Sequence, residues 1–282
     1  MLVGTVSNAA MTKNGPVGVL DSGVGGLSIL RALRGELPNE AFLYVADQAH
    51  LPYGPRPLDE IRAFVRGITR FLLERNAKIV VVACNAASAA GLHDLRATFA
   101  GVPFVGMEPA VKPAAAATRS GVIAVLTTAA TAAGPLYASV LHRFANGTRV
   151  ETLVCPELVT AVETGQTDLA ALRPLFDRAL APALAAGADQ IVLGCTHFPF
   201  AAEAICAYAG PGVTVIDPSA AVARQARRLL ESHDLLADPG LPPQPTRYFT
   251  TGNPRRFEVV AGALLGEKVT ATGLAWSGAE IR

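Results

Sequence analysis

The stretch Ile191-Val192-Leu193-Gly194-Cys195-Thr196-His197-Phe198-Pro199 begins as a short apolar run and ends in a thiol, a hydroxyl and an imidazole. A continuous apolar run is typical of a strand that lies in a parallel sheet and is covered on both faces. In open α/β sheets, ligands bind beyond the carboxyl ends of the strands. The stretch therefore predicts an α/β fold and places a polar site at the end of one buried strand.

This strand and its cysteine have a counterpart 111 residues earlier, where Val80-Val81-Val82-Ala83 runs into Cys84-Asn85. Val102-Pro103-Phe104-Val105 and Val213-Thr214-Val215-Ile216 continue the match at the same spacing, and each is followed by an acidic residue and a proline, Glu108-Pro109 and Asp217-Pro218. Upstream of each cysteine, a short apolar strand leads into a polar loop. We therefore predict two similar α/β domains with mostly parallel sheets of the flavodoxin-like type, related by a pseudo-twofold axis with the active site between them.

The rest of the chain alternates short β-branched runs with amphipathic stretches, as expected for this fold class. We predict strands at 17–20, 42–46 and 79–83, and helices at 27–34 and 58–75. The predicted domain organisation is a flexible N-terminal tail (1–15), a first α/β domain (16–109 plus 218–282) and a second α/β domain (110–217).

Length and composition restrict the function classes. The 282 residues, 51% of them hydrophobic, suffice for two modest domains, and the net charge of +1 indicates neither nucleic acid nor an anionic membrane as partner. The four cysteines form no disulfide framework and no Cys-x-x-Cys clamp, so we expect no metal and a cytoplasmic location. The uncharged window 120–141 contains Gly, Thr and Pro, which predicts a strand, a loop and a helix and not a membrane span. No secretory signal is evident at the N-terminus.

Two thiols in one cleft suit a specific chemistry. If the domains face each other, Cys84 and Cys195 approach a small molecule from opposite sides, and inversion of a carbon needs a base on one face and an acid on the other. A nearby imidazolium or a helix N-terminus lowers the pKa of a cysteine below its usual value of about 8.5. His197 follows Cys195 closely, and Asp21 lies on the loop after the first strand. We expect one imidazole and one carboxylate each to tune a thiol.

Each of these residues also has a purely structural interpretation. Cys155 and Cys206 are interpreted as small hydrophobic residues. Asp21 could cap a helix, and the glycines of Gly23-Val24-Gly25-Gly26 could serve a turn, because their spacing does not fit a dinucleotide fingerprint. From composition alone, Glu163 would be a solvated charge on a helix.

Five motifs in chain order resemble those of the glutamate racemases, in the aspartate/glutamate racemase superfamily. They are Asp21-Ser22-Gly23-Val24-Gly25-Gly26, Pro52-Tyr53-Gly54, Ala83-Cys84-Asn85, Leu158-Val159-Thr160-Ala161-Val162-Glu163-Thr164-Gly165 and Gly194-Cys195-Thr196-His197-Phe198-Pro199. Phe249-Thr250-Thr251-Gly252 resembles the family's late segment. The resemblance runs from about residue 17 to residue 230.

The resemblance implies a cofactor-independent isomerase that interconverts L- and D-glutamate with two bases and supplies D-glutamate for peptidoglycan, usually as a homodimer. The catalytic residues that it implies are Cys84, Cys195, Asp21, Glu163 and His197. The substrate-binding residues that it implies are Ser22, Pro52, Tyr53, Gly54, Asn85, Thr128, Thr131 and Thr196. Thr127 offers an alternative register for the threonine segment.

The chain departs from the family pattern at two positions. Ala86 stands where the family usually has threonine, which removes one neutral hydrogen bond of about 1 kcal/mol, and we consider Ser88 as its replacement. His50 stands where arginine is common. His197 favours glutamate, since the aspartate branch commonly has Glu there. The alternatives are a racemase of aspartate or a related amino acid, a non-catalytic amino-acid-binding module, and a thiol- or metal-dependent hydrolase.

Overall fold

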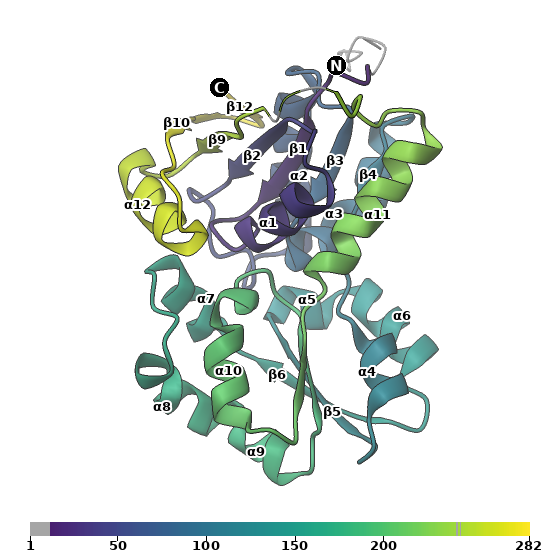
Figure 1. The fold of residues 1–282 in the computed structure, drawn as a ribbon, viewed down its shortest axis with the longest axis vertical. Coiled ribbons are helices and arrows are strands. Elements are labelled where there is room, and N and C mark those ends of the chain that lie inside the picture. The colour runs from purple at the N-terminus through teal and green to yellow at the C-terminus, as the bar shows by residue number, and fades with distance from the viewer. Residues whose placement is uncertain (1–11, 241, 243) are drawn as a thin grey trace.

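Two parallel sheets dominate the computed structural model, which describes residues 12–240, 242 and 244–282 (Figure 1). The first sheet has the order β10 (Ala271–Gly273), β9 (Arg247–Thr250), β2 (Phe42–Ala46), β1 (Val17–Asp21), β3 (Ile79–Val82) and β4 (Phe104–Val105). The second has the order β6 (Arg149–Val154), β5 (Val122–Thr127), β7 (Gln190–Leu193) and β8 (Thr214–Ile216). A small antiparallel pair, β11 (Trp276–Ser277) with β12 (Glu280–Ile281), lies near the C-terminus.

The two sheets share one topology. In the first half, β2 pairs with β1, β1 with β3 and β3 with β4, all in parallel. In the second half, β6 pairs with β5, β5 with β7 and β7 with β8 in the same way. This is the flavodoxin-like strand order, so the predicted fold class is confirmed. Strands β9 and β10 extend the first sheet from the C-terminal part of the chain.

The chain passes between the sheets twice. It leaves β4 for the second half through residues 106–110 and returns from β8 through residues 217–218. The predicted domain boundaries fall in these two segments, and they stay a prediction.

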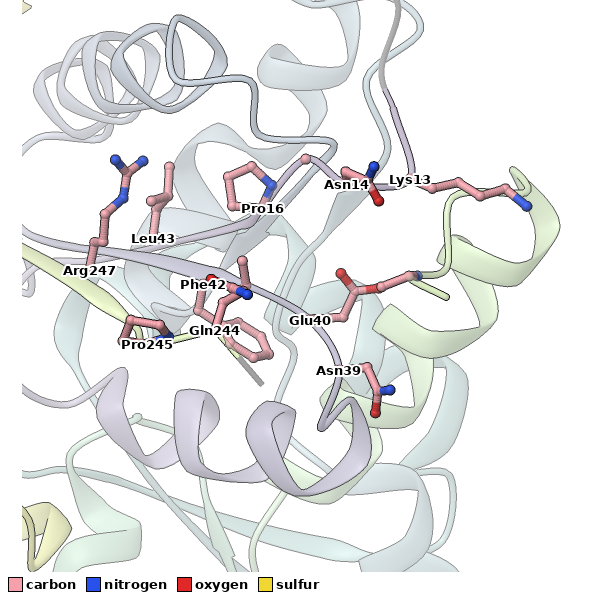
Figure 2. Close-up of a pocket in the computed structure, with 13 residues that line it drawn as sticks. Lys13, Asn14, Pro16, Asn39, Glu40, Phe42, Leu43, Gln244, Pro245 and Arg247 are labelled. Carbon is pink, nitrogen blue, oxygen red and sulfur yellow. The ribbon is translucent and has the colours of Figure 1, made fainter. Parts of the chain in front are cut away.

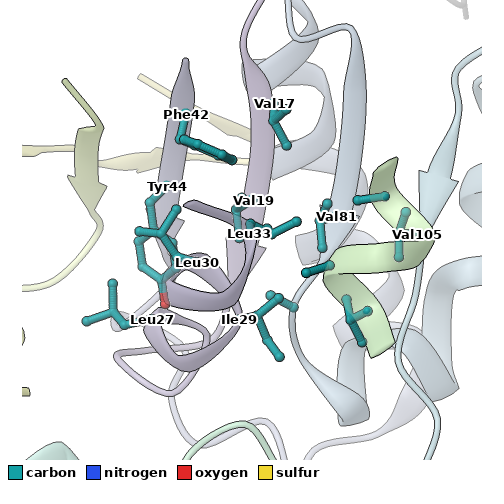
Figure 3. Close-up of a cluster of buried hydrophobic side chains, with 14 of the residues drawn as sticks. Val17, Val19, Leu27, Ile29, Leu30, Leu33, Phe42, Tyr44, Val81 and Val105 are labelled. Carbon is teal, nitrogen blue, oxygen red and sulfur yellow. The ribbon is translucent and has the colours of Figure 1, made fainter. Parts of the chain in front are cut away.

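Helices cover both faces of the first sheet because successive side chains of each strand point to opposite sides. Val17 and Val19 pack against α1 (Leu27–Glu36), α11 (Ser219–Ser232) and α12 (Pro254–Leu265), as Figure 3 shows in part. Leu20 packs on the other face, against α2 (Leu58–Leu73) and α3 (Asn85–Thr98). The apolar stripe predicted for residues 58–75 is the buried face of α2.

The second sheet is covered in the same way. Ile123 and Val125 face α4 (Val111–Ala117) and α6 (Pro135–Phe144), while Ala124 and Leu126 face the opposite helices. Those helices are α7 (Pro156–Glu163), α8 (Leu169–Ala179), α9 (Ala181–Ala185), the 3-10 helix η1 (Phe198–Ala201) and α10 (Ala202–Ala209). The short helix α5 (Ala129–Ala133) follows β5 and contacts α3 of the first half. No helix in the described part of the chain is both long and apolar enough to cross a membrane.

The amino-terminal edge of the first sheet contains a buried ion pair. The ammonium of Lys78 lies 2.6 Å from Glu40 Oε2, and it also donates to the carbonyl of Lys13. Lys13 and Glu40 border a cavity of about 420 Å³ at the edge of the sheet away from the loops that carry the predicted site (Figure 2). Residues 12–15 of the predicted tail therefore contact the sheet edge. Residues 1–11 of that tail lie outside the described residues.

Candidate active site

A cavity of about 180 Å³ lies between the two sheets, at the carboxyl ends of their strands. Such a volume suits a ligand of a few non-hydrogen atoms, smaller than the usual drug-sized site. The predicted residues that line it are Ser22, Pro52, Tyr53, Gly54, Cys84, Asn85, Thr128, Cys195, Thr196 and His197. The structure thus brings both cysteines, which follow the equivalent third strands β3 and β7, to one cavity.

Cys84 occupies the N-cap position of α3 and is buried. Its sulfur lies 3.9 Å from the Ser22 hydroxyl and is hydrogen-bonded by the Ala87 N–H. Burial raises the pKa of Cys84 well above its usual value, and the nearby Asp21 carboxylate raises it further, against the smaller effect of these two hydrogen bonds. Our expectation of a lowered pKa is wrong for this thiol, because desolvation and a like charge outweigh the helix N-terminus.

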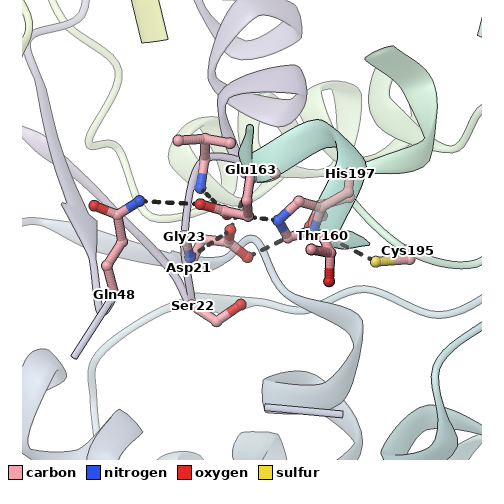
Figure 4. Close-up of polar contacts among 12 residues, drawn as sticks. Asp21, Ser22, Gly23, Gln48, Thr160, Glu163, Cys195 and His197 are labelled. Carbon is pink, nitrogen blue, oxygen red and sulfur yellow. Dashed lines mark hydrogen bonds and ion pairs between the residues drawn. The ribbon is translucent and has the colours of Figure 1, made fainter. Parts of the chain in front are cut away.

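Cys195 belongs to a hydrogen-bonded chain of three side chains (Figure 4). His197 Nδ1 lies 3.6 Å from Cys195 Sγ, and His197 Nε2 lies 2.7 Å from Glu163 Oε1. Burial disfavours the imidazolium, yet the contacts with Cys195 and Glu163 raise the pKa of His197 well above its usual value. Burial likewise opposes the ionised form of Glu163. The pKa of Glu163 is nevertheless lowered, because the carboxylate accepts hydrogen bonds from His197, Val24 and Gln48 and lies beside the imidazolium charge.

Asp21 connects the two halves from behind the cavity. Its Oδ2 accepts from the N–H groups of Gly23 at 3.1 Å and Gly26 at 2.9 Å, and its Oδ1 accepts from the Thr196 hydroxyl at 3.4 Å. Burial raises the pKa of Asp21, while the His197 charge and the two backbone N–H groups oppose that rise. Asp21 therefore holds the glycine loop and also places a negative charge near Cys84.

Three predicted residues do not line the cavity. Asp21 and Glu163 lie behind it as described, and Thr131 is buried with its hydroxyl 3.2 Å from that of Thr128. Of the two threonine registers, Thr128 lines the cavity, whereas Thr127 turns its hydroxyl toward the Gly194 carbonyl at 3.4 Å.

Asn85 gives the clearest indication that the cavity accepts a polar ligand. Its side chain is 3% exposed and lines the cavity, and neither its Oδ1 nor its Nδ2 has a hydrogen-bond partner among the residues that the structure describes. A buried polar group without a partner costs about 1–3 kcal/mol. An amide can donate to a carboxylate and accept from an ammonium group, so Asn85 suits the two charged groups of an amino acid.

Ala86 lines the cavity without a hydroxyl, and Ser88 does not replace it. The Ser88 hydroxyl donates to the Val82 carbonyl at 3.1 Å and accepts from the Met107 N–H at 2.9 Å. Ser88 therefore fastens α3 to the strand end, and the hydroxyl that the family pattern would place here is absent.

Sequence reasoning missed one wall of the cavity, formed by Val154, Pro156 and Val159. Val154 ends β6, and the other two lie in α7. The internal repeat could have indicated them, because the loop after β6 corresponds to the loop after β2 that carries Pro52-Tyr53-Gly54. Among the described residues, no group of three or more His, Cys, Asp or Glu side chains could hold a metal ion.

Comparisons with known proteins agree with this geometry. The family Asp/Glu/Hydantoin racemase matches residues 27–226. The glutamate racemase of Ectopseudomonas mendocina is 49% identical over 253 residues, which cover 90% of this chain and 95% of that protein. A glutamate racemase crystal structure from Bacillus anthracis is 34% identical, with a TM-score of 0.83 over 93% of this chain and 97% of that one. The Escherichia coli glutamate racemase, solved with L-glutamate and the activator UDP-MurNAc-Ala, is 32% identical, with a TM-score of 0.81 over 94% and 100%.

Proposed function

We propose that this chain, which belongs to the Asp/Glu/Hydantoin racemase family, interconverts L- and D-glutamate with two thiols and without a cofactor. The observation that carries the proposal is that Cys84 and Cys195, one from each half, line a single small cavity. The match to glutamate racemases over most of the chain supports glutamate as the substrate. We further propose that the D-glutamate is made in the cytoplasm for peptidoglycan, and that the enzyme is a homodimer.

The proposed reaction begins with Cys195 as a thiolate beside the His197 imidazolium. The thiolate removes the α-proton of the bound amino acid, and the electron pair of the broken C–H bond is delocalised into the α-carboxylate. The Cys84 thiol then delivers its proton to the opposite face of the carbon. Cys195 ends as a thiol and Cys84 as a thiolate, and the reverse reaction uses the two groups in exchanged roles.

A thiolate alone is a weak base for this proton, so the carboxylate must be stabilised as negative charge develops on it. Buried donors that point at such a charge typically contribute about 3 kcal/mol each. The Asn85 amide and the hydroxyls of Ser22, Thr128 and Thr196 line the cavity and could supply these donors. Asp21, Glu163 and His197 assist the proton transfers from behind the thiols.

The test is incubation with each glutamate enantiomer in D2O, using the wild type, Cys84→Ala and Cys195→Ala. We expect the wild type to invert the substrate with incorporation of deuterium at the α-carbon, and each variant to lose inversion. Inversion at the wild-type rate in either variant would overturn the two-thiol mechanism. Binding without deuterium uptake in the wild type would indicate an amino-acid-binding module, and faster inversion of aspartate than of glutamate would correct the substrate.

A further inference from the structure

Gln48 lies directly beyond the carboxyl end of β2, outside the cavity, and connects two parts of the chain that are distant in sequence. Its Nε2 lies 3.0 Å from Glu163 Oε2 (Figure 4). Its Oε1 lies 3.0 Å from the Thr250 hydroxyl. Thr250 ends β9, which pairs with β2 in register. The late segment Phe249-Thr250-Thr251-Gly252 thereby reaches the second half of the molecule through one side chain.

The direction of these hydrogen bonds follows from the donors available. The Gly252 N–H donates to Thr250 Oγ1 at 3.0 Å, so the Thr250 hydroxyl proton is free to donate to Gln48 Oε1. An ionised carboxylate can only accept, so the amide nitrogen of Gln48 must face Glu163. Thr250 is fully buried, and it therefore holds the amide in the one orientation that donates to Glu163.

This contact completes the hydrogen bonding of Glu163. Its Oε1 accepts from the Val24 N–H and lies against His197 Nε2, both at 2.7 Å, and its Oε2 accepts from Gln48. Without Gln48, Oε2 loses this donor, and the carboxylate can rotate away from the imidazole. His197 is the group that carries any such displacement on to Cys195.

We propose that Gln48, oriented by Thr250, is a positioning residue for the Cys195 half of the proton-transfer apparatus. Gln48 does not line the cavity in which we place the substrate. It acts through Glu163 and His197, and the Cys84 side lies outside this chain of contacts. The inference rests on the proposed racemase reaction and deepens it.

A positioning role for one thiol differs from general support of the fold in a measurable way. In a two-thiol racemase, each enantiomer gives its α-proton to a different thiol. Slower transfer at Cys195 makes C–H cleavage more rate-limiting for the enantiomer that Cys195 deprotonates, and less so for the other. The deuterium isotope effects on kcat/KM of the two α-deuterated enantiomers must then change in opposite directions.

The experiment compares Gln48→Leu and Thr250→Val with the matched control Thr69→Val. Thr69 is fully buried in α2 of the same half, and its hydroxyl has no hydrogen-bond partner in the described part of the chain, so loss of this hydroxyl should leave activity unchanged. We expect Gln48→Leu to lower kcat by roughly tenfold, as for a lost hydrogen bond to a charged group, with KM within about twofold. Thr250→Val should show a smaller loss of the same kind.

His197→Asn supplies the reference pattern of isotope effects for the Cys195 side. We expect Gln48→Leu and Thr250→Val to shift the two isotope effects in opposite directions, with the signs seen in His197→Asn. Isotope effects that are unchanged, or that shift together for both enantiomers, would overturn the proposal, as would an equal kcat loss in Thr69→Val. If Gln48→Leu does not fold, Thr250→Val decides. A wild type without racemisation would instead overturn the proposed function.

Discussion

Gly25 offers a direct test of the contact between the glycine loop and the imidazole. A Cβ added at Gly25 would lie 2.4 Å from His197 Nδ1, 2.6 Å from His197 Cε1 and 2.7 Å from Thr196 Oγ1. These distances are far below van der Waals contact. The backbone of Gly25 is outside the left-handed region, so the effect of Gly25→Ala comes from this collision and not from backbone strain.

The size of the effect follows from what His197 would lose. The ring is 2% exposed and is held by Glu163 at 2.7 Å, so it has little room to move without breaking that contact or its approach to Cys195. A hydrogen bond to a charged group contributes about 1.5–3 kcal/mol. If the loss appears fully in the transition state, kcat/KM falls by roughly 10- to 150-fold.

The assay is circular dichroism of glutamate racemisation in both directions, with Gly35→Ala as the matched control. Gly35 lies in α1, and a Cβ there meets nothing within 4 Å. We expect the control to keep its activity and to gain about 0.5–1 kcal/mol of stability, since alanine is the better helix former. A Gly25→Ala enzyme with kcat/KM within about threefold of this control would refute the importance of the imidazole position.

Three further predictions follow from buried polar groups. Asn85→Ala should raise KM for glutamate by roughly tenfold without lowering the melting temperature, because it removes a polar group that has no hydrogen-bond partner within the described ranges. A lowered melting temperature with unchanged KM would contradict this. The pKa of Glu163 is lowered in the folded protein, so its ionised form stabilises the fold at pH values above its usual pKa of 4.5. The pKa of His197 is raised, so its protonated form stabilises the fold at pH values below its usual pKa of 6.5. In urea unfolding, the stability difference between wild type and His197→Asn should therefore be largest between these pH values, and should shrink as pH rises through the raised pKa of His197; growth of the difference up to pH 9 would refute the sign. Lys78→Met should lower the free energy of unfolding by about 3–5 kcal/mol, because it leaves Glu40 buried without the ammonium that lies 2.6 Å from it. The kcat of the folded enzyme should be unchanged.

Local sequence patterns predicted the strands and helices well because they depend on near neighbours. The helix predicted at 27–34 continues to Glu36, and the strand predicted at 79–83 ends at Val82, where Ala83 leads into Cys84 at the N-cap of α3. The repeat spacing of 111 residues identified both cysteines, because duplicated halves keep equivalent residues at equivalent strand ends. These successes needed no knowledge of how the halves pack.

The features that the sequence could not predict all depend on packing between distant segments. Gln48 meets Thr250 only because β9 pairs beside β2, a register that no local pattern encodes. The neighbouring Asp47 is similar, since its carboxylate accepts from Thr251 at 2.8 Å and from Trp276 Nε1 at 2.7 Å, both more than 200 residues away. The raised pKa of Cys84 depends on burial and on the charge of Asp21, so the sign of its shift also required coordinates.

The unequal surroundings of the two thiols have a consequence for the proposed reaction. Burial and the Asp21 charge raise the pKa of Cys84 and favour its thiol form, whereas Cys195 Sγ lies 3.6 Å from His197 Nδ1. In the proposed reaction, the enantiomer that gives its α-proton to Cys195 reacts directly with the enzyme form that carries its proton on Cys84. The other enantiomer requires the proton to move to Cys195 first. Since the two enantiomers are equal in free energy, this difference cannot change the equilibrium, and it must instead appear as a step in which the free enzyme exchanges one protonation state for the other.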